Sequence, residues 1–177
     1  MIEEEVILVD KTDQPVGTMP KLQAHIEGKL HRAFSVFIFN YSGELLLQQR
    51  AFDKYHSGGK WTNTCCSHPF PGEKTLSAAK RRLKEEMGME CTLKPAFSFS
   101  YKTEFENGLI ENEYDHVYFG LSDDLPQPNP KEVANFSYIK MEELESRLAD
   151  EGKKYTEWLK ICFKEVMAHY KKFQIND

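Results

Sequence analysis

Short apolar runs separated by turn residues dominate the first half of the chain and predict strands. Residues 6–9 form one such run. Two more, residues 34–39 and 45–49, flank a turn sequence that ends in Gly43. We therefore expect the second and third runs to pair as antiparallel strands.

Residues 73–87 have the periodicity of an amphipathic helix. Apolar side chains recur there every three or four positions, at Leu76, Ala79, Leu83 and Met87. Gly88 follows directly, and glycine is a frequent residue just past the end of a helix. This pattern predicts a helix with one buried stripe.

The second half of the chain predicts further strands and a last helix. Strand-like runs occupy residues 97–103, 113–121 and 136–140, and the proline-rich residues 125–130 form a loop because proline donates no N–H to a sheet. The segment from Thr156 has apolar residues at helical spacing: Leu159, Cys162, Phe163, Val166, Tyr170 and Phe173. We expect an α+β sandwich of helix, mixed sheet and helix, formed by residues 1–177 as one domain.

Composition narrows the class of protein. The net charge is −5, and the basic residues are scattered, which argues against a nucleic-acid partner. No apolar run reaches membrane-spanning length, and residues 1–5 are acidic, unlike a targeting peptide. The four cysteines show no CxxC spacing, so we expect reduced thiols in a soluble, cytoplasmic protein that does not bind membranes.

Cys66 and His68 are the first candidates for chemistry. On an extended segment, residues two apart point to the same side, so these two would face one site. Adjacent Cys65 would face the other way and fill space in the core, as free cysteines often do. A nearby divalent cation would favour the Cys66 thiolate and bring its pKa from about 8.5 toward neutrality.

Three imidazoles and two carboxylates suggest a metal site. Glu111 and Glu113 share one face if they begin a strand, and His25 and His31 add two nitrogen ligands to that of His68. Such a mixed set of ligands suits a divalent metal. Alone, the Glu-x-Glu pair is more often a solvated strand edge, and each histidine is more often a surface residue than a ligand.

Charged and aromatic residues elsewhere leave alternatives open. Lys21, Arg50 and Lys54 lie in or beside expected loops, where a diphosphate could use them or where they simply face water. Trp158 is either core or an indole face for a cation. The helix carries ionic residues that could merely pair on its surface: Glu73, Arg81, Arg82, Glu85 and Glu86.

The motif of residues 62–69, the Glu111-Asn112-Glu113 triplet and the His25/His31 pair together resemble the type I isopentenyl diphosphate isomerases. The likeness extends over most of the chain, with the motifs in the family's order. It implies a Nudix-like α/β/α fold and a catalytic cysteine at Cys66. It also implies a Mn²⁺, Mg²⁺ or Zn²⁺ ion held by five residues: His25, His31, His68, Glu111 and Glu113.

The resemblance assigns further roles. Glu113 would be both a metal ligand and a catalytic carboxylate assisted by Tyr101, and Glu86 would bind a Mg²⁺ ion bridged to the substrate. Trp158 would pack on the isoprenoid tail. The diphosphate contacts would be Lys21, Arg50, Lys54, Ser67 and Arg82.

The Nudix hydrolase signature provides a check on this likeness. Aligned on Gly88, its pattern places Glu73, Arg81, Leu83, Glu85 and Glu86 in register. Two positions depart from it, since Ser67 replaces the first glycine and Arg82 replaces a glutamate that hydrolases use as a metal ligand. Both departures favour isomerisation over hydrolysis.

The expected activity is therefore metal-dependent interconversion of isopentenyl and dimethylallyl diphosphate, with Cys66 and Glu113 transferring protons and Trp158 stabilising the carbocation. The alternatives are a Nudix hydrolase and a non-catalytic module that binds metal or senses thiols. Flavin-dependent isomerases use a TIM barrel, for which 177 residues are too few. We expect a monomer or weak homodimer, and the sequence leaves open the metal, the first proton donor, the direction of the reaction and the substrate range.

Overall fold

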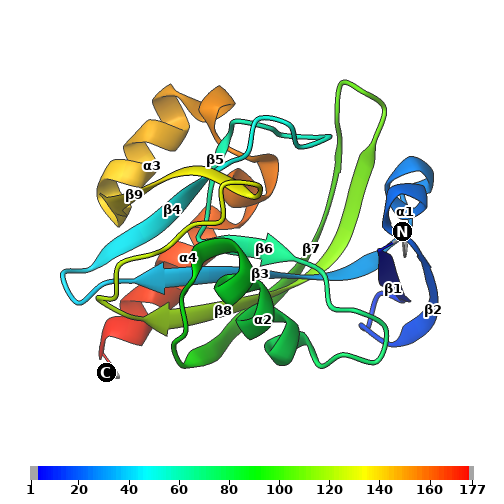
Figure 1. Ribbon diagram of the computed structural model, residues 1–177, viewed down its shortest axis with the longest axis horizontal. Coiled ribbons are helices and arrows are strands. Elements are labelled where there is room, and N and C mark those ends of the chain that lie inside the picture. The colour runs from blue at the N-terminus through cyan, green and yellow to red at the C-terminus, as the bar shows by residue number, and fades with distance from the viewer. Residues whose placement is uncertain (1–3, 176–177) are drawn as a thin grey trace.

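The computed structural model describes residues 4–175, which form one nine-stranded mixed sheet with helices on both faces (Figure 1). The strands are β1 (Glu5–Val9), β2 (Pro15–Pro20), β3 (His31–Phe39), β4 (Glu44–Arg50), β5 (Trp61–Thr62), β6 (Cys65–Ser67), β7 (Leu93–Glu104), β8 (Ile110–Leu121) and β9 (Val133–Lys140). The helices are α1 (Lys21–Glu27), α2 (Thr75–Met87), α3 (Met141–Asp150), the 3₁₀ turn η1 (Gly152–Lys154) and α4 (Glu157–Ile175).

Strand β3 organises the sheet. Along one edge it pairs in parallel with β8, from His31 opposite Glu113 to Phe39 opposite Leu121. It also pairs antiparallel with β1, β6 and β4 at successive points along its length. Strand β7 then extends the sheet beyond β8, and β4 pairs with β5 and β9. Strands β6 and β8 therefore both lie next to β3.

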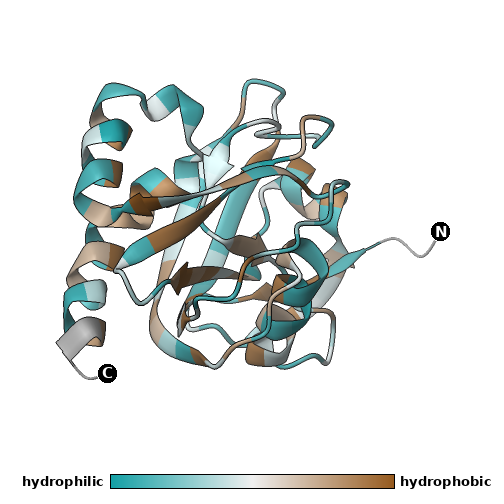
Figure 2. Cartoon of the chain, turned by 60° about the vertical axis from the view of Figure 1, so that its left-hand side comes forward, coloured by the Kyte–Doolittle hydropathy of each residue, from teal (hydrophilic) through white to brown (hydrophobic). Residues whose placement is uncertain are grey.

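The two faces of β3 enter two hydrophobic cores. Phe34, Val36 and Ile38 pack with the buried stripe of α2, whereas Phe37 and Phe39 pack with α3 and α4. This alternation follows from the two-residue period of a strand. Hydrophobic residues are accordingly concentrated in the central strands between the helices (Figure 2). The predicted α+β sandwich of helix, sheet and helix is confirmed.

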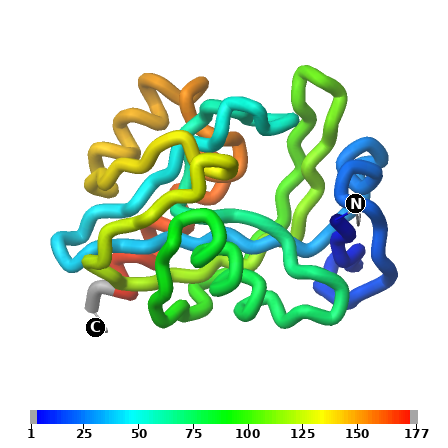
Figure 3. Tube along the Cα trace, viewed as in Figure 1, coloured from blue at the N-terminus to red at the C-terminus, as the bar shows by residue number. Residues whose placement is uncertain are grey.

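Several predicted elements are confirmed, with boundaries that differ. The two strands around residues 40–43 are antiparallel, but only Phe39 and Leu45 pair directly, because β3 and β4 diverge to take up other partners. Strands β7 and β8 are longer than expected, since their hairpin extends past the cores and its tip projects from the sheet (Figure 3).

Other elements were not predicted. Helix α1 has only seven residues and α3 only ten, and β2 is almost entirely exposed. Lys21 begins α1 and is not a loop residue. Residues 1–3 of the acidic start lie outside the described part of the chain. Among residues 4–175, no helix combines the length and apolarity needed to cross a membrane.

Gly88 ends helix α2, as predicted, and two features of its position require glycine. Its φ is +63°, and a Cβ there would lie 2.6 Å from the carbonyl oxygen of Gln127. The amide of Gln127 in turn donates to the carbonyl of Met87 at the helix end. The close approach of the loop at residues 125–130 therefore depends on the missing side chain.

We predict that Gly88→Ala lowers the free energy of unfolding more than Gly72→Ala does. Gly72 also has a positive φ, of +79°, but an added Cβ there would have no heavy atom within 4 Å. The control should therefore show only the backbone cost, about 1–2 kcal/mol, while Gly88→Ala adds a steric cost of about 1–3 kcal/mol. Chemical denaturation measures both variants, and equal losses would contradict the role of the Gln127 contact.

Candidate functional site

Strand β8 presents three carboxylates to one side of the sheet. Glu111, Glu113 and Asp115 are buried, and the intervening residues Asn112 and Tyr114 are only half-buried. The prediction that Glu111 and Glu113 share a face is confirmed. Asp115 continues the same stripe and accepts a hydrogen bond from the Ser35 hydroxyl at 2.8 Å.

His25, His31, His68 and Glu113 form a buried cluster that could hold a metal ion. Each offers one ligand atom, and these atoms lie within 4.8 Å of one another. The cluster draws on α1, the start of β3, the residue after β6, and β8. Glu111, the fifth predicted ligand, is not part of this four-residue group.

The hydrogen bonds of His31 show why a cation fits the cluster. Its Nδ1 lies 2.8 Å from the carbonyl oxygen of Lys29, which can only accept, so Nδ1 carries the proton. In the neutral ring, Nε2 then carries no proton and can only accept a hydrogen bond. It lies 3.4 Å from Glu113 Oε1, which is also an acceptor. Two acceptors this close repel each other, and a cation between them removes the conflict.

His25 shows a similar arrangement. Its Nδ1 contacts the Tyr55 hydroxyl at 2.8 Å, and its buried Nε2 has no hydrogen-bond partner. Burial, together with the neighbouring histidines, lowers the pKa of His25 to about 3. Burial also lowers the pKa of His68 to about 4, although its contact with Glu113 opposes this. Both rings are therefore neutral at pH 7, the form in which imidazole binds metals.

One tyrosine hydroxyl connects the two glutamates. The Tyr101 oxygen lies 2.7 Å from Glu113 Oε2 and 3.0 Å from Glu111 Oε2. Burial and the charge of Glu113 raise the pKa of Glu111 well above its usual value. Burial opposes ionisation of Glu113 too, but contacts with His31 and His68 bring its pKa well below the usual value. The hydroxyl therefore connects two carboxyl groups of different proton affinity.

Cys66 lines the pocket, and Cys65 faces the opposite way. Cys65 is fully buried in the core against α2, as the two-residue period predicted. Cys66 pairs in register with Ser35 of β3, and its side chain borders the same pocket as His68. Burial raises the pKa of the Cys66 thiol above its ordinary value. The protein groups alone thus favour the protonated thiol.

A pocket of about 630 Å³, open to solvent, joins these groups. His68, Tyr101, Glu111 and Glu113 line it together with Cys66. The remaining predicted site residues also line it: Lys21, Arg50, Lys54, Ser67, Arg82, Glu86 and Trp158. The structure therefore brings every predicted site residue to this pocket or to the adjoining histidine cluster.

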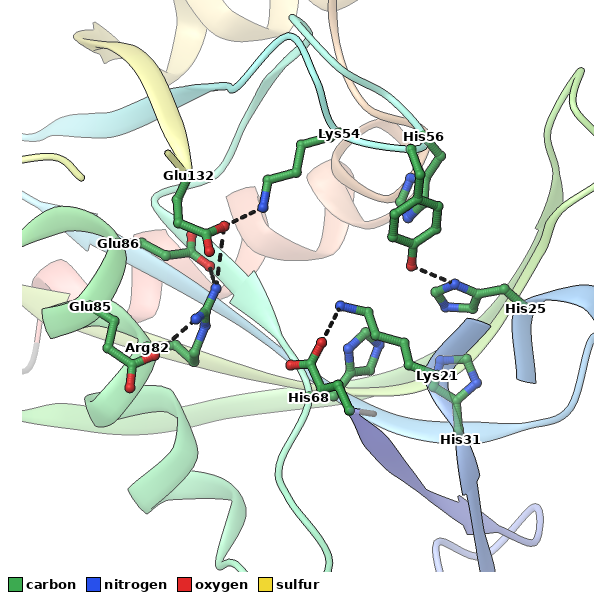
Figure 4. Close-up of polar contacts among 12 residues, drawn as sticks. Lys21, His25, His31, Lys54, His56, His68, Arg82, Glu85, Glu86 and Glu132 are labelled. Carbon is green, nitrogen blue, oxygen red and sulfur yellow. Dashed lines mark hydrogen bonds and ion pairs between the residues drawn. The ribbon is translucent and has the colours of Figure 1, made fainter. Parts of the chain in front are cut away.

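Acidic partners hold most of the basic residues (Figure 4). Lys54 and Arg82 both pair with Glu132, and Arg82 also donates to Glu86 at 2.6 Å. Lys21 contacts the half-exposed Glu4 at 3.1 Å. The second oxygen of Glu86 accepts from Gln48 at 2.9 Å. An anion or cation entering here would exchange partners with existing ion pairs.

Arg50 and Trp158 form another wall of the pocket. The guanidinium carbon of Arg50 lies 5.3 Å from the centre of the Trp158 ring, a cation–π distance. Its buried Nε has no hydrogen-bond partner, so one donor of Arg50 is available. Trp158 is buried, and its indole N–H donates to Asn63 Oδ1 at 3.2 Å. Trp158 is therefore a buried residue that also lines the pocket.

Some pocket residues escaped the sequence analysis. Asp115 could have been found by extending the period of two from Glu111 and Glu113. His56, in the β4–β5 loop, and Glu132, after the proline-rich loop, carry no periodic signal. Gln48 could not be distinguished by sequence from an ordinary polar residue of a strand.

Comparisons with known proteins identify the family. Residues 29–159 match the NUDIX domain model. The isopentenyl-diphosphate Delta-isomerase of Pectobacterium atrosepticum is 51% identical over 170 residues, which cover 96% of this chain and 95% of that protein. Isopentenyl-diphosphate Delta-isomerase 2 of Aromatoleum aromaticum is 49% identical, over 94% of this chain and 88% of that protein.

Solved structures agree in fold. DR0079 from Deinococcus radiodurans superposes with a TM-score of 0.77 at 21% identity, covering 92% of this chain and 98% of that one. The MutT protein from Methanosarcina mazei Go1 gives a TM-score of 0.66 at 16% identity, covering 82% and 95%. At these identities the likeness is one of fold alone.

We predict that a divalent cation stabilises the protein through the histidine cluster. At 100 times its dissociation constant, Mn²⁺ should raise the free energy of unfolding by about 2.7 kcal/mol. His31→Ala should lose this gain, whereas His169→Ala, at a half-buried position on α4 outside the cluster, should keep it. Denaturation with and without Mn²⁺ measures the difference, and equal stabilisation of His31→Ala would place the ion elsewhere.

Proposed function

The chain belongs to the isopentenyl-diphosphate Delta-isomerase family of Nudix-fold proteins, and we propose that it interconverts isopentenyl and dimethylallyl diphosphate. The observation that carries the proposal is the pocket that a thiol and a carboxylate, Cys66 and Glu113, line together beside a cluster that could hold a metal ion.

The reaction moves a double bond by one position. A proton is added to the terminal alkene carbon, and another is removed from the allylic carbon, which lies between the double bond and the carbon that carries the diphosphate. The number of protons and electrons is unchanged, so no redox cofactor is needed. Because an alkene is a very weak base, the acid must be held against it, and the intermediate cation must be kept from water.

Cys66 and Glu113 are suited to the two proton transfers. They project from β6 and β8, which pair with opposite edges of β3. A substrate lying over β3 would therefore meet one group on each side. Tyr101 would orient Glu113 through its 2.7 Å contact, and the order of the two transfers is left open.

The divalent ion would have five ligands: His25, His31, His68 and Glu113, which lie together, and Glu111, two residues before Glu113 on the same face of β8. The unpartnered Nε2 atoms of His25 and His31 support this assignment. When bound, the ion would hold Glu113 in its ionised form and fix its position. The choice among Mn²⁺, Mg²⁺ and Zn²⁺ stays open, since imidazole and carboxylate ligands suit each of them.

The diphosphate would bind at the basic end of the pocket. Arg50 has a free buried donor there, and Lys54, Arg82, Lys21 and Ser67 surround the same space. Glu86 would hold a Mg²⁺ ion, which would offset the negative charge of the diphosphate. Anchoring the substrate at this end positions its alkene against the proton-transfer groups, and the Trp158 ring face would stabilise the cation.

The contacts of helix α2 weigh against hydrolysis. Arg81 binds both oxygens of Glu73 at 2.8 Å, and Arg82 contacts Glu85 and Glu86. Arg82 therefore places a positive charge where the hydrolase signature has a metal-binding glutamate, so helix α2 offers a metal ion one carboxylate fewer. Release of inorganic phosphate or of a nucleoside monophosphate would favour the hydrolase instead.

We predict that Cys66→Ala abolishes turnover and that Cys65→Ala does not. The two thiols are adjacent, but only Cys66 borders the pocket, so the pair separates chemistry from loss of a sulfur atom. The assay incubates each protein with Mg²⁺ and isopentenyl diphosphate in D₂O and follows dimethylallyl diphosphate and deuterium uptake by NMR. Wild-type rates in Cys66→Ala would remove this residue from the mechanism.

We also predict that Glu113→Gln is inactive in the same NMR assay, even with metal present. The amide cannot accept and return a proton as a carboxylate does.

We further predict that chelation inactivates the wild-type enzyme. Wild-type activity should return when Mn²⁺ or Zn²⁺ is added back, with Mg²⁺ present for the diphosphate. Full activity in protein shown by elemental analysis to be metal-free would defeat the metal assignment.

A further inference from the structure

His56, in the loop between β4 and β5, has an imidazole whose orientation is fixed by aromatic rings. It stacks on Phe105 with ring centres 4.8 Å apart and planes 13° apart. Tyr55 meets it edge-on at 4.7 Å, and Trp158 does so at 6.1 Å. The ring is buried, so packing leaves it little freedom to rotate.

This fixed ring faces Glu111. His56 Nε2 lies 3.3 Å from Glu111 Oε1, and the other carboxyl oxygen contacts the Tyr101 hydroxyl at 3.0 Å. Glu111 is only 4% exposed, so its carboxyl group depends mainly on these contacts with protein groups. Without His56, one oxygen of a buried carboxyl group would lose its contact.

The preceding residue supports a different part of the site. The Tyr55 hydroxyl lies 2.8 Å from His25 Nδ1, the contact dashed beside His25 in Figure 4. The loop itself is tied to the β7–β8 turn, because Asn107 Nδ2 donates to the Tyr55 carbonyl at 3.1 Å. Two consecutive residues thus contact groups on two separate elements, α1 and β8.

We infer that Tyr55 and His56 form a clip that positions His25 and Glu111 and thereby sets how tightly the cluster holds its ion. The inference rests on the proposed function, because it takes the cluster as a metal site. Groups that hydrogen-bond to metal ligands fix their orientation, and losing one typically weakens metal binding 10–100-fold. Both residues of the clip are positioning residues that act through the groups they contact.

The test titrates metal-free protein with Mn²⁺ by calorimetry, in the absence of any diphosphate. Tyr55→Phe removes one oxygen and keeps the ring, and His56→Phe keeps the stack on Phe105 but removes the N–H. Each should raise the Mn²⁺ dissociation constant about 10-fold or more. His56→Gln should restore most of the affinity, because its amide offers an N–H at similar reach. The exposed Tyr41→Phe is the matched control and should bind as the wild type does.

Melting temperatures of the metal-free proteins separate positioning from folding. A merely structural role would lower the melting temperature and leave the Mn²⁺ affinity of the folded protein unchanged. The clip is overturned if folded Tyr55→Phe binds Mn²⁺ as tightly as the wild type, if His56→Gln binds no better than His56→Phe, or if the wild type binds no Mn²⁺. If His56→Phe does not fold, Tyr55→Phe decides the test.

Failure of the proposed function would look different. A wild-type protein that binds Mn²⁺ but does not convert isopentenyl diphosphate would refute the isomerase assignment. The clip would still stand or fall on the dissociation constants alone.

Discussion

The burial of ionisable groups around Glu113 is the constraint on which the rest of the structure depends. A carboxylate removed from water is costly unless nearby groups compensate for its lost hydration. Glu113 therefore depends on His31, once a proton or a metal ion lies between the two, on the imidazole of His68 and on the hydroxyl of Tyr101. The parallel pairing of β3 with β8 supplies the first of these directly, since His31 and Glu113 stand opposite each other in register. The central pair of strands thus builds the cluster as well as the core.

The basic end of the pocket depends on a segment without regular structure. The loop after β8 donates backbone hydrogen bonds to the last carbonyls of α2, from Gln127 to Met87 and from Asn129 to Glu86. Three residues later, Glu132 pairs with Lys54 and Arg82. One loop therefore both ends the helix that carries Glu86 and supplies the counter-ion for two of the basic residues. This is why the close approach at Gly88 matters for the site.

The sequence was most informative where a local pattern determined the structure. The apolar spacing of α2 and the period of two in β8 placed Gly88, Glu111 and Glu113 correctly, because each depends on neighbours a few residues away. Helix α1 is too short to show a period, although it carries Lys21 and His25. His56 and Glu132 were missed because distant segments, the β7–β8 turn and α2, hold them in place. Resemblance to a family supplied the roles of residues that periodicity could not.

The junction between α4 and β5 bears on how the protein reaches its folded state. The Trp158 indole donates to Asn63, 95 positions earlier, and the hydroxyls of Thr62 and Thr156 lie 2.8 Å apart. The wall of the pocket is therefore completed by a segment that leaves the ribosome long after His25, His31 and Cys66. A nascent chain can form the early strands and α2, but it cannot enclose the site until the last helix docks. Such contacts between distant parts of the chain slow folding, so the site is among the last features of the molecule to form.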